Sequence, residues 1–208
     1  MEGPTTRLIL IRHAEVEASY HRIFGGSRID MRLSHKGHAQ ADGLAKYLRN
    51  HPFEACYCSP MIRAQHTALP LLAGRDVSLV TLPSLREVDF GAWTGYGWAA
   101  VHERFGVSAF DWLTELEHGR IPDGDSVSSL RERVEPCLRR IILNCAGKSA
   151  AVVCHGGIVR MILSLLTNMP LSKFSSFEVD YASVTVVDCH PRKTEIQLMN
   201  FTPWRDLP

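Results

Sequence analysis

The chain has 208 residues, 45% of them hydrophobic, and its 23 basic and 22 acidic residues leave a formal net charge of +1. This length fits one domain with an elaboration, and the small net charge excludes bulk binding of nucleic acid. The apolar run at 8–11 is too short for a signal peptide, and no run approaches the roughly 20 apolar residues of a membrane span. We therefore expect a cytoplasmic protein without a membrane partner.

The six cysteines do not form a pattern typical of a metal site. Zinc sites usually combine two close pairs of ligands, and the chain contains no Cys-x-x-Cys. Thiols are reduced by default in a long chain that lacks a secretory signal. We expect no disulfide, no metal and no other cofactor.

The predicted elements alternate between strands and helices along the chain. Short apolar runs predict strands at 7–11, 55–58, 77–82, 150–154, 183–188 and 194–200. Helical periodicity and capping residues predict helices at 33–50, 59–68, 127–141 and 158–166. This alternation indicates an α/β fold, a three-layer sandwich in which helices cover both faces of a mostly parallel sheet.

Single residues refine these helices. We expect Ser34 to cap the first helix, with Gln40 on its polar face. We expect Ser59 to cap the second helix, with Pro60 at the first helical position. In the long third helix Pro136 removes a backbone hydrogen bond, which predicts a kink or a break there.

The segment between residues 83 and 122 carries Trp93, Trp98 and Trp112 and two weakly amphipathic helical stretches. We expect a lid-like insertion at about 87–122, within a single domain that spans 1–208. For the three tryptophans, packing inside the lid is favoured over stacking on a base or sugar.

Charged residues follow three of the predicted strands. Arg12 and His13 come after the first, Arg63 lies one helical turn beyond the second, and His155 with Gly156 follows the fourth. Ligands of open α/β sheets bind outside the carboxyl ends of the strands. Arginine forks match phosphate oxygens, and a helix that starts near Gly156 offers free N–H groups to an anion. The pattern therefore predicts a pocket for a phosphoryl group.

Six segments, in order, resemble motifs of the histidine phosphatase family, which includes the cofactor-dependent phosphoglycerate mutases. The first is Leu-Ile-Arg-His-Ala-Glu at 10–15, and the others lie at 26–41, 59–68, 85–95, 122–126 and 152–157. Two positions depart from the pattern: Ala14 replaces the usual glycine, and Ser19 stands near where many members carry an asparagine that helps to hold the phosphate.

The resemblance implies both a mechanism and a set of site residues. His13 would attack phosphorus, with its ring held by a hydrogen bond to a backbone carbonyl, and water would then hydrolyse the phosphohistidine. Glu87 would protonate the departing alkoxide and then activate the water. The substrate-binding residues implied are Arg12, Arg63, His155, Gly156, Ser19 and Gly26.

Three functions stay open at this point. The segment 86–91 is more similar to that of the phosphatases, including the α-ribazole phosphatases of cobalamin synthesis, than to that of the mutases. We therefore predict metal-independent hydrolysis of a small phosphorylated metabolite, with α-ribazole phosphate as the first candidate. The alternatives are a phosphoglycerate mutase and a phospho-ligand binding protein without turnover, although a pure binder would need no acid. A homodimer is the assembly considered.

A cluster of basic residues precedes the first predicted helix. A charge run of this kind is more often a solvated loop than a clamp for an anionic substrate tail. Its members are His21, Arg22, Arg28 and Arg32.

Overall fold

The computed structural model describes residues 3–207, and a six-stranded sheet forms its middle layer, with strand order β3-β2-β4-β1-β5-β6. The strands are β1 (Thr6–Arg12), β2 (Ala55–Cys58), β3 (Leu79–Thr81), β4 (Ser149–Cys154), β5 (Val184–Cys189) and β6 (Thr194–Phe201). The pairs β1–β4, β2–β4 and β2–β3 are parallel, whereas β5 runs antiparallel to both β1 and β6. The predicted mostly parallel sheet is confirmed.

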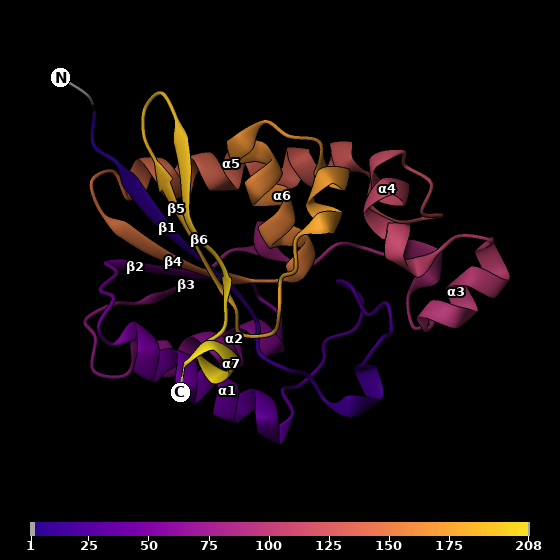
Figure 1. Ribbon diagram of the computed structural model, residues 1–208, viewed down its shortest axis with the longest axis horizontal. Coiled ribbons are helices and arrows are strands. Elements are labelled where there is room, and N and C mark those ends of the chain that lie inside the picture. Colours follow the sequence, from indigo (N-terminus) through magenta and orange to yellow (C-terminus); the bar gives the residue numbers. More distant parts are fainter. Residues whose placement is uncertain (1–2, 208) are drawn as a thin grey trace.

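Helices cover both faces of this sheet, as predicted (Figure 1). On one face lie α1 (His35–Leu48), α2 (Ile62–Ala68) and the C-terminal α7 (Pro203–Asp206). On the other lie α5 (Val127–Asn144) and α6 (Gly156–Thr167). The short helices α3 (Trp98–Phe105) and α4 (Trp112–Glu117) sit to one side of the sheet, in the segment that the sequence suggests is a lid.

Six short 3-10 turns complete the elements. They are η1 (Ala18–Tyr20), η2 (Leu69–Leu72), η3 (Pro83–Leu85), η4 (Gly91–Trp93), η5 (Ala109–Asp111) and η6 (Leu171–Ser176).

The central strand β1 shows why the chain folds into three layers. Successive strand residues point to opposite faces, so Leu8 and Leu10 join the hydrophobic core under α5 and α6, while Ile9 and Ile11 join the core under α1 and α2. Each of these side chains is at most 3% exposed. Burial of such a side chain stabilises the fold by about 1.5–3 kcal/mol, which fixes β1 and the residues that follow it.

Ser34 caps α1 as predicted, because its Oγ accepts a hydrogen bond from the Gly37 amide at 2.9 Å. The prediction that Gln40 lies on the polar face is wrong. Its side chain is buried and its Oε1 accepts from the Glu15 amide at 2.9 Å. Helical periodicity misplaces this residue because the loop after β1 needs a polar partner inside the core.

Two further expectations about helices need correction. The second helix begins at Ile62, after Met61 and not after Ser59. The Ser59 Oγ still accepts from the Met61 amide at 3.3 Å, so it closes a turn ahead of the helix. The helix α5 runs through Pro136 without a break, because the buried residues on either side pack as one face and the proline is exposed. A kink at Pro136 stays a prediction.

The parallel strands β1, β2 and β4 all end at the same edge of the sheet. The residues that follow them, from Arg12, Ser59 and His155 onward, are therefore brought together there. Within residues 3–207 no helix is long and apolar enough to cross a bilayer.

Candidate active site

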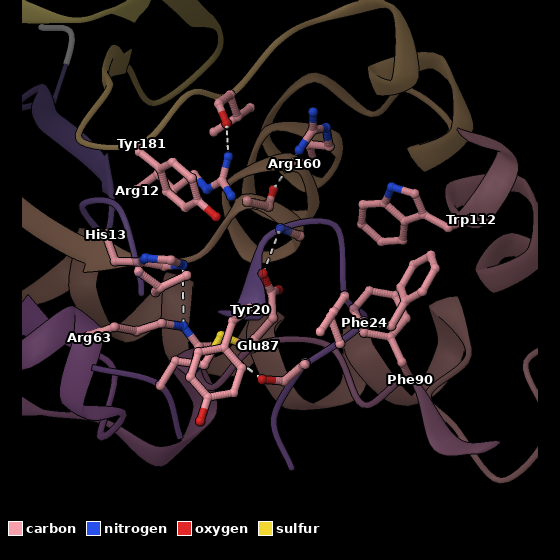
Figure 2. A pocket seen from close by; sticks show the side chains of 18 of the residues that line it. Arg12, His13, Tyr20, Phe24, Arg63, Glu87, Phe90, Trp112, Arg160 and Tyr181 are labelled. Atoms are coloured by element: carbon pink, nitrogen blue, oxygen red, sulfur yellow. Dashed lines mark hydrogen bonds between the residues drawn. The ribbon is translucent and has the colours of Figure 1, made fainter. Parts of the chain in front are cut away.

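A cavity of about 370 Å³ opens beyond the carboxyl ends of these strands. This volume lies within the usual range for small-molecule sites, about 300–1,000 Å³. Figure 2 shows that one side of the cavity carries Arg12, His13, Arg63 and Arg160, whereas Phe24, Phe90 and Trp112 gather on the other. The site therefore has a cationic half and an aromatic half.

His13 follows β1 directly and is 5% exposed. Its Nδ1 lies 2.8 Å from the Ala14 carbonyl oxygen, and its Nε2 accepts a hydrogen bond from Arg63 Nε at 3.3 Å. This pattern places the ring proton on Nδ1 and a lone pair on Nε2. Burial, together with the charges of Arg63 and Arg12, holds the pKa of His13 well below its ordinary value. The ring is therefore neutral and nucleophilic at pH 7.

Arg63, on α2, is buried, and every nitrogen of its guanidinium has a partner. Nε donates to His13 Nε2, as described above. Nη1 donates to the Ile29 carbonyl at 3.1 Å, and Nη2 donates to the Gly26 carbonyl at 2.9 Å. Gly26 has a φ of +52°, and a Cβ there would collide with the Val88 carbonyl oxygen. Only glycine lets this loop approach so closely. Gly26 lines the cavity and orients Arg63 through its carbonyl.

Arg12 is held differently. Its Nη1 donates to the Val179 carbonyl, and its guanidinium carbon lies 4.1 Å from the centre of the Tyr181 ring. Its Nε is buried and has no hydrogen-bond partner among the described residues. A buried N–H without a partner is costly, so this donor is a natural contact for a ligand oxygen.

His155 directly follows β4 and is fully buried behind the cavity wall, with 5.2 Å between its ring centre and that of His13. Its Nε2 is 2.7 Å from the Ser59 hydroxyl, and its Nδ1 is buried without a partner in the part of the chain that the structure describes. Burial and the nearby Arg63 charge hold the pKa of His155 well below its ordinary value. When the Ser59 hydroxyl donates to Nε2, the neutral ring carries its proton on Nδ1 as a donor.

Glu87 reaches the cavity from the loop after η3. Its Oε2 accepts from the Gly157 amide at 3.3 Å, in the first turn of α6, and its Oε1 accepts from the Val88 amide at 3.0 Å. A Cβ on Gly157 would lie 2.5 Å from Glu87 Oε1, so any larger residue there would displace the Glu87 carboxylate. Gly156, its neighbour, lines the cavity, and its contact with substrate stays a prediction.

The two other carboxylates near these motifs are engaged elsewhere. Glu15 accepts from Ser34 Oγ at 3.0 Å and pairs with Lys36 at 3.1 Å, and Asp89 pairs with Arg28 at 2.7 Å. Of these three carboxylates, Glu87 is the one that lines the cavity.

Some predicted contacts do not lie at the cavity. Ser19 is exposed on η1, and the cavity is lined instead by the next residue, Tyr20. Arg28 pairs with Asp89, and His21 Nε2 contacts the Val16 carbonyl at 3.0 Å. Like these two, the remaining residues of the basic cluster are exposed and absent from the cavity wall, in line with the solvated loop.

The sequence did not mark Ser59, Arg160 or Tyr181 as residues of the site. The position of Ser59 could have indicated a site residue, since a serine directly after a buried strand lies at the ligand-binding edge of the sheet. The proline that follows it favours a helix cap instead. Arg160 lies one helical turn after Gly156, so its Nη1 can donate to the Gly156 carbonyl, at 3.3 Å. Helical spacing could have found it. For Tyr181 the sequence holds no such signal.

The aromatic half comes largely from the segment 87–122. Trp98 and Phe110 pack edge to face with 4.8 Å between ring centres, and Phe90 packs against Trp112 at 5.4 Å. Trp93 is 1% exposed and belongs to the core. The prediction of internal packing therefore fits Trp93, whereas Trp98 and Trp112 line the cavity.

Comparison with known proteins identifies the class to which this fold and site belong. The sequence profile of the histidine phosphatase superfamily (branch 1) matches residues 8–202. The chain therefore belongs to the histidine phosphatase superfamily, and the predicted family, α/β fold and phosphatase class are confirmed.

Two curated relatives and one solved structure show how close this relationship is. The adenosylcobalamin/alpha-ribazole phosphatase of Salmonella typhimurium is 30% identical over 96% of this chain and 98% of its own length. Phosphoserine phosphatase 1 of Hydrogenobacter thermophilus is also 30% identical, over 94% of this chain and 92% of its own. The crystal structure of the alpha-ribazole phosphatase from Shigella flexneri superposes with a TM-score of 0.81 at 26% identity, covering 94% and 96% of the two chains.

Proposed function

We propose that the protein hydrolyses phosphomonoesters of small metabolites through a phosphohistidine formed on His13 Nε2. The observation that carries this proposal is the hydrogen bond from Nδ1 to the Ala14 carbonyl, which leaves the lone pair of Nε2 at the cationic half of the cavity. A neutral imidazole can attack phosphorus, and the lowered pKa of His13 keeps it neutral at physiological pH.

In the first step the Nε2–P bond forms and the bond from phosphorus to the ester oxygen breaks. Glu87, in its protonated form, gives its proton to the departing alkoxide, which leaves as an alcohol. In the second step water attacks phosphorus, Glu87 takes back a proton and the Nε2–P bond breaks. Inorganic phosphate leaves, and His13 is again neutral.

The transition state carries its charge on the equatorial phosphoryl oxygens. Arg12 and Arg63 supply fixed positive charge there, and Arg12 Nε is a buried donor without a protein partner among residues 3–207. His155 would add its Nδ1–H, and Gly156 the start of α6 with its N–H groups. Because these groups are held before substrate arrives, little reorganisation opposes the reaction.

For the substrate we propose α-ribazole phosphate first. Relatives carry the names alpha-ribazole phosphatase and phosphoserine phosphatase. The aromatic half favours the first, because Trp98, Phe110 and Trp112 offer ring faces and edges to a flat leaving group. The residues at about 87–122, which carry these rings, would act as the lid.

We further propose that this reaction takes place in the cytoplasm and that nucleic acid is no substrate, which the near-neutral net charge supports. The homodimer stays a prediction.

The experiment is phosphate release from α-ribazole phosphate, phosphoserine, sugar phosphates and 3-phosphoglycerate, with wild type and His13→Ala side by side and a chelator present. We expect release by wild type alone. Equal release by His13→Ala would refute the nucleophile. Interconversion of 2- and 3-phosphoglycerate without release would assign a mutase instead, and binding without turnover would assign a phospho-ligand binding protein.

A further inference from the structure

Tyr181 lies in the turn between η6 and β5, where no motif of the sequence pointed to a site residue. Its ring covers the Arg12 guanidinium at 4.1 Å and stands 5.5 Å from the His13 ring, measured between centres (Figure 2). It therefore forms a wall beside both groups that would meet the phosphoryl group.

The segment 179–182 is joined to the end of β1 at several points. The Val179 carbonyl accepts from Arg12 Nη1, and the Ala182 amide donates to the His13 carbonyl at 3.2 Å. The Tyr181 ring thus covers one face of the Arg12 guanidinium, and Nη1 is already hydrogen-bonded. Nε is the nitrogen that can still donate to a ligand. Ala182 adopts a φ of +54°, a left-handed conformation that is unfavourable for alanine and persists only when its surroundings impose it.

The C-terminal segment 200–205 holds the two residues before Ala182. The Asp180 amide donates to Asn200 Oδ1 at 2.7 Å, and Asn200 Nδ2 donates back to Asp180 Oδ2 at 2.9 Å. Arg205 forms an ion pair with the same carboxylate, and Trp204 Nε1 donates to the Tyr181 carbonyl at 3.0 Å. The C-terminal segment therefore fixes the backbone on both sides of the Tyr181 side chain.

We propose that Tyr181 is a positioning residue for the phosphate-binding Arg12, and that the C-terminal segment 200–205 acts on the site through it. The inference rests on the proposed phosphate site. The ring face attracts the guanidinium and restricts it to one orientation, so that Arg12 is oriented at the cavity before the phosphoryl group arrives. The phenol hydroxyl is not needed for this role.

The test is the affinity for inorganic phosphate, measured by isothermal titration calorimetry, which requires no turnover. We expect Tyr181→Leu, which keeps bulk but has no ring face, to weaken phosphate about tenfold, in the range of a partly desolvated cation–π contact. Tyr181→Phe should stay within about twofold of wild type, because the ring is retained. As a control, Tyr96→Leu removes a ring that covers the Arg104 guanidinium outside the cavity and should leave the affinity unchanged.

The link to the C-terminal segment is tested by Asp180→Ala. Asp180 is an anionic neighbour of Arg160, so charge alone predicts that its removal tightens phosphate binding. Positioning predicts the opposite, because the variant removes the carboxylate that accepts from Asn200 Nδ2 and pairs with Arg205. We expect about threefold weaker binding. Melting temperatures of all variants identify any loss of folding.

The outcomes separate the hypotheses. Wild-type affinity in Tyr181→Leu would overturn the positioning role, and a Tyr181→Phe variant as weak as Tyr181→Leu would transfer the effect to the hydroxyl. Unchanged or tighter binding in Asp180→Ala would overturn the link to the C-terminal segment. If wild type itself bound no phosphate, both the proposed function and this inference would fall.

Discussion

Ser59 Oγ and His155 Nε2 lie 2.7 Å apart, both fully buried, at the ends of the adjacent parallel strands β2 and β4. When this hydroxyl donates to Nε2, the proton of the neutral His155 ring lies on Nδ1, because an imidazole that accepts at one nitrogen donates from the other.

Ser59→Ala should therefore lower kcat about tenfold and destabilise the protein. The variant leaves His155 Nε2 buried without a partner, at a cost of about 1–3 kcal/mol. Steady-state kinetics and urea unfolding check both effects. A variant that loses stability but keeps its kcat would show that Ser59 supports the fold alone.

Glu87→Gln should lower kcat for alkyl phosphates by about 10²–10⁴, the usual contribution of a general acid. The loss in the first step should be much smaller for p-nitrophenyl phosphate, whose leaving group departs without a proton. Single-turnover measurement of alcohol release isolates this step. Glu178→Gln is the matched control, because Glu178 also lines the cavity but is exposed. Equal losses for both leaving groups would argue against Glu87 as the acid.

Phe110→Ala should raise KM for α-ribazole phosphate about fivefold, equivalent to ~1 kcal/mol, and leave KM for phosphoserine unchanged. Phe110 is 72% exposed, so the variant should fold normally. The comparison of the two substrates checks the prediction, with Leu143→Ala, 75% exposed on α5, as the control. A parallel rise in both KM values would contradict an aromatic leaving-group site.

The free energy of unfolding should fall as pH decreases from 7 to 5. Burial lowers the pKa of both His13 and His155 in the folded state, so below about 6.5 the unfolded chain binds protons that the native protein excludes. The slope is at most about 1.4 kcal/mol per pH unit for each such histidine. Urea unfolding at pH 7, 6 and 5 measures it, and His155→Gln should reduce the slope. Carboxylates whose pKa is lowered in the folded state change the free energy of unfolding only below this pH range. A flat profile would mean that these rings protonate in the folded state.

The sequence predicts the residues at the strand ends of this site better than the residues that support them. Strand ends and glycines mark Arg12, His13 and His155, because parallel topology brings such positions to one edge whatever their distance along the chain. Ser59 was predicted only as a helix cap, because a serine before a proline fits a helix start as well as it fits the ligand-binding edge of a sheet.

Other details depend on contacts that no periodicity encodes. The burial of Gln40 follows from an amide in the loop after β1, 25 residues earlier. Tyr181 meets Arg12 only because β5 returns antiparallel beside β1. Neither spacing nor composition carries that information, because it arises when distant segments pack together.

The strand order also has a consequence for how the protein is made. Strand β1 pairs only with β4 and β5, which begin at Ser149 and Val184. During synthesis, both edges of β1 thus lack their partner strands while α1 to α5 are produced. Its four apolar residues lack part of the core that later covers them. An exposed strand of this kind can pair with other chains. A ribosome-bound chain that ends before β4 should therefore need to be protected by chaperones. In such a chain His13 would lack all the contacts that β4 and β5 supply.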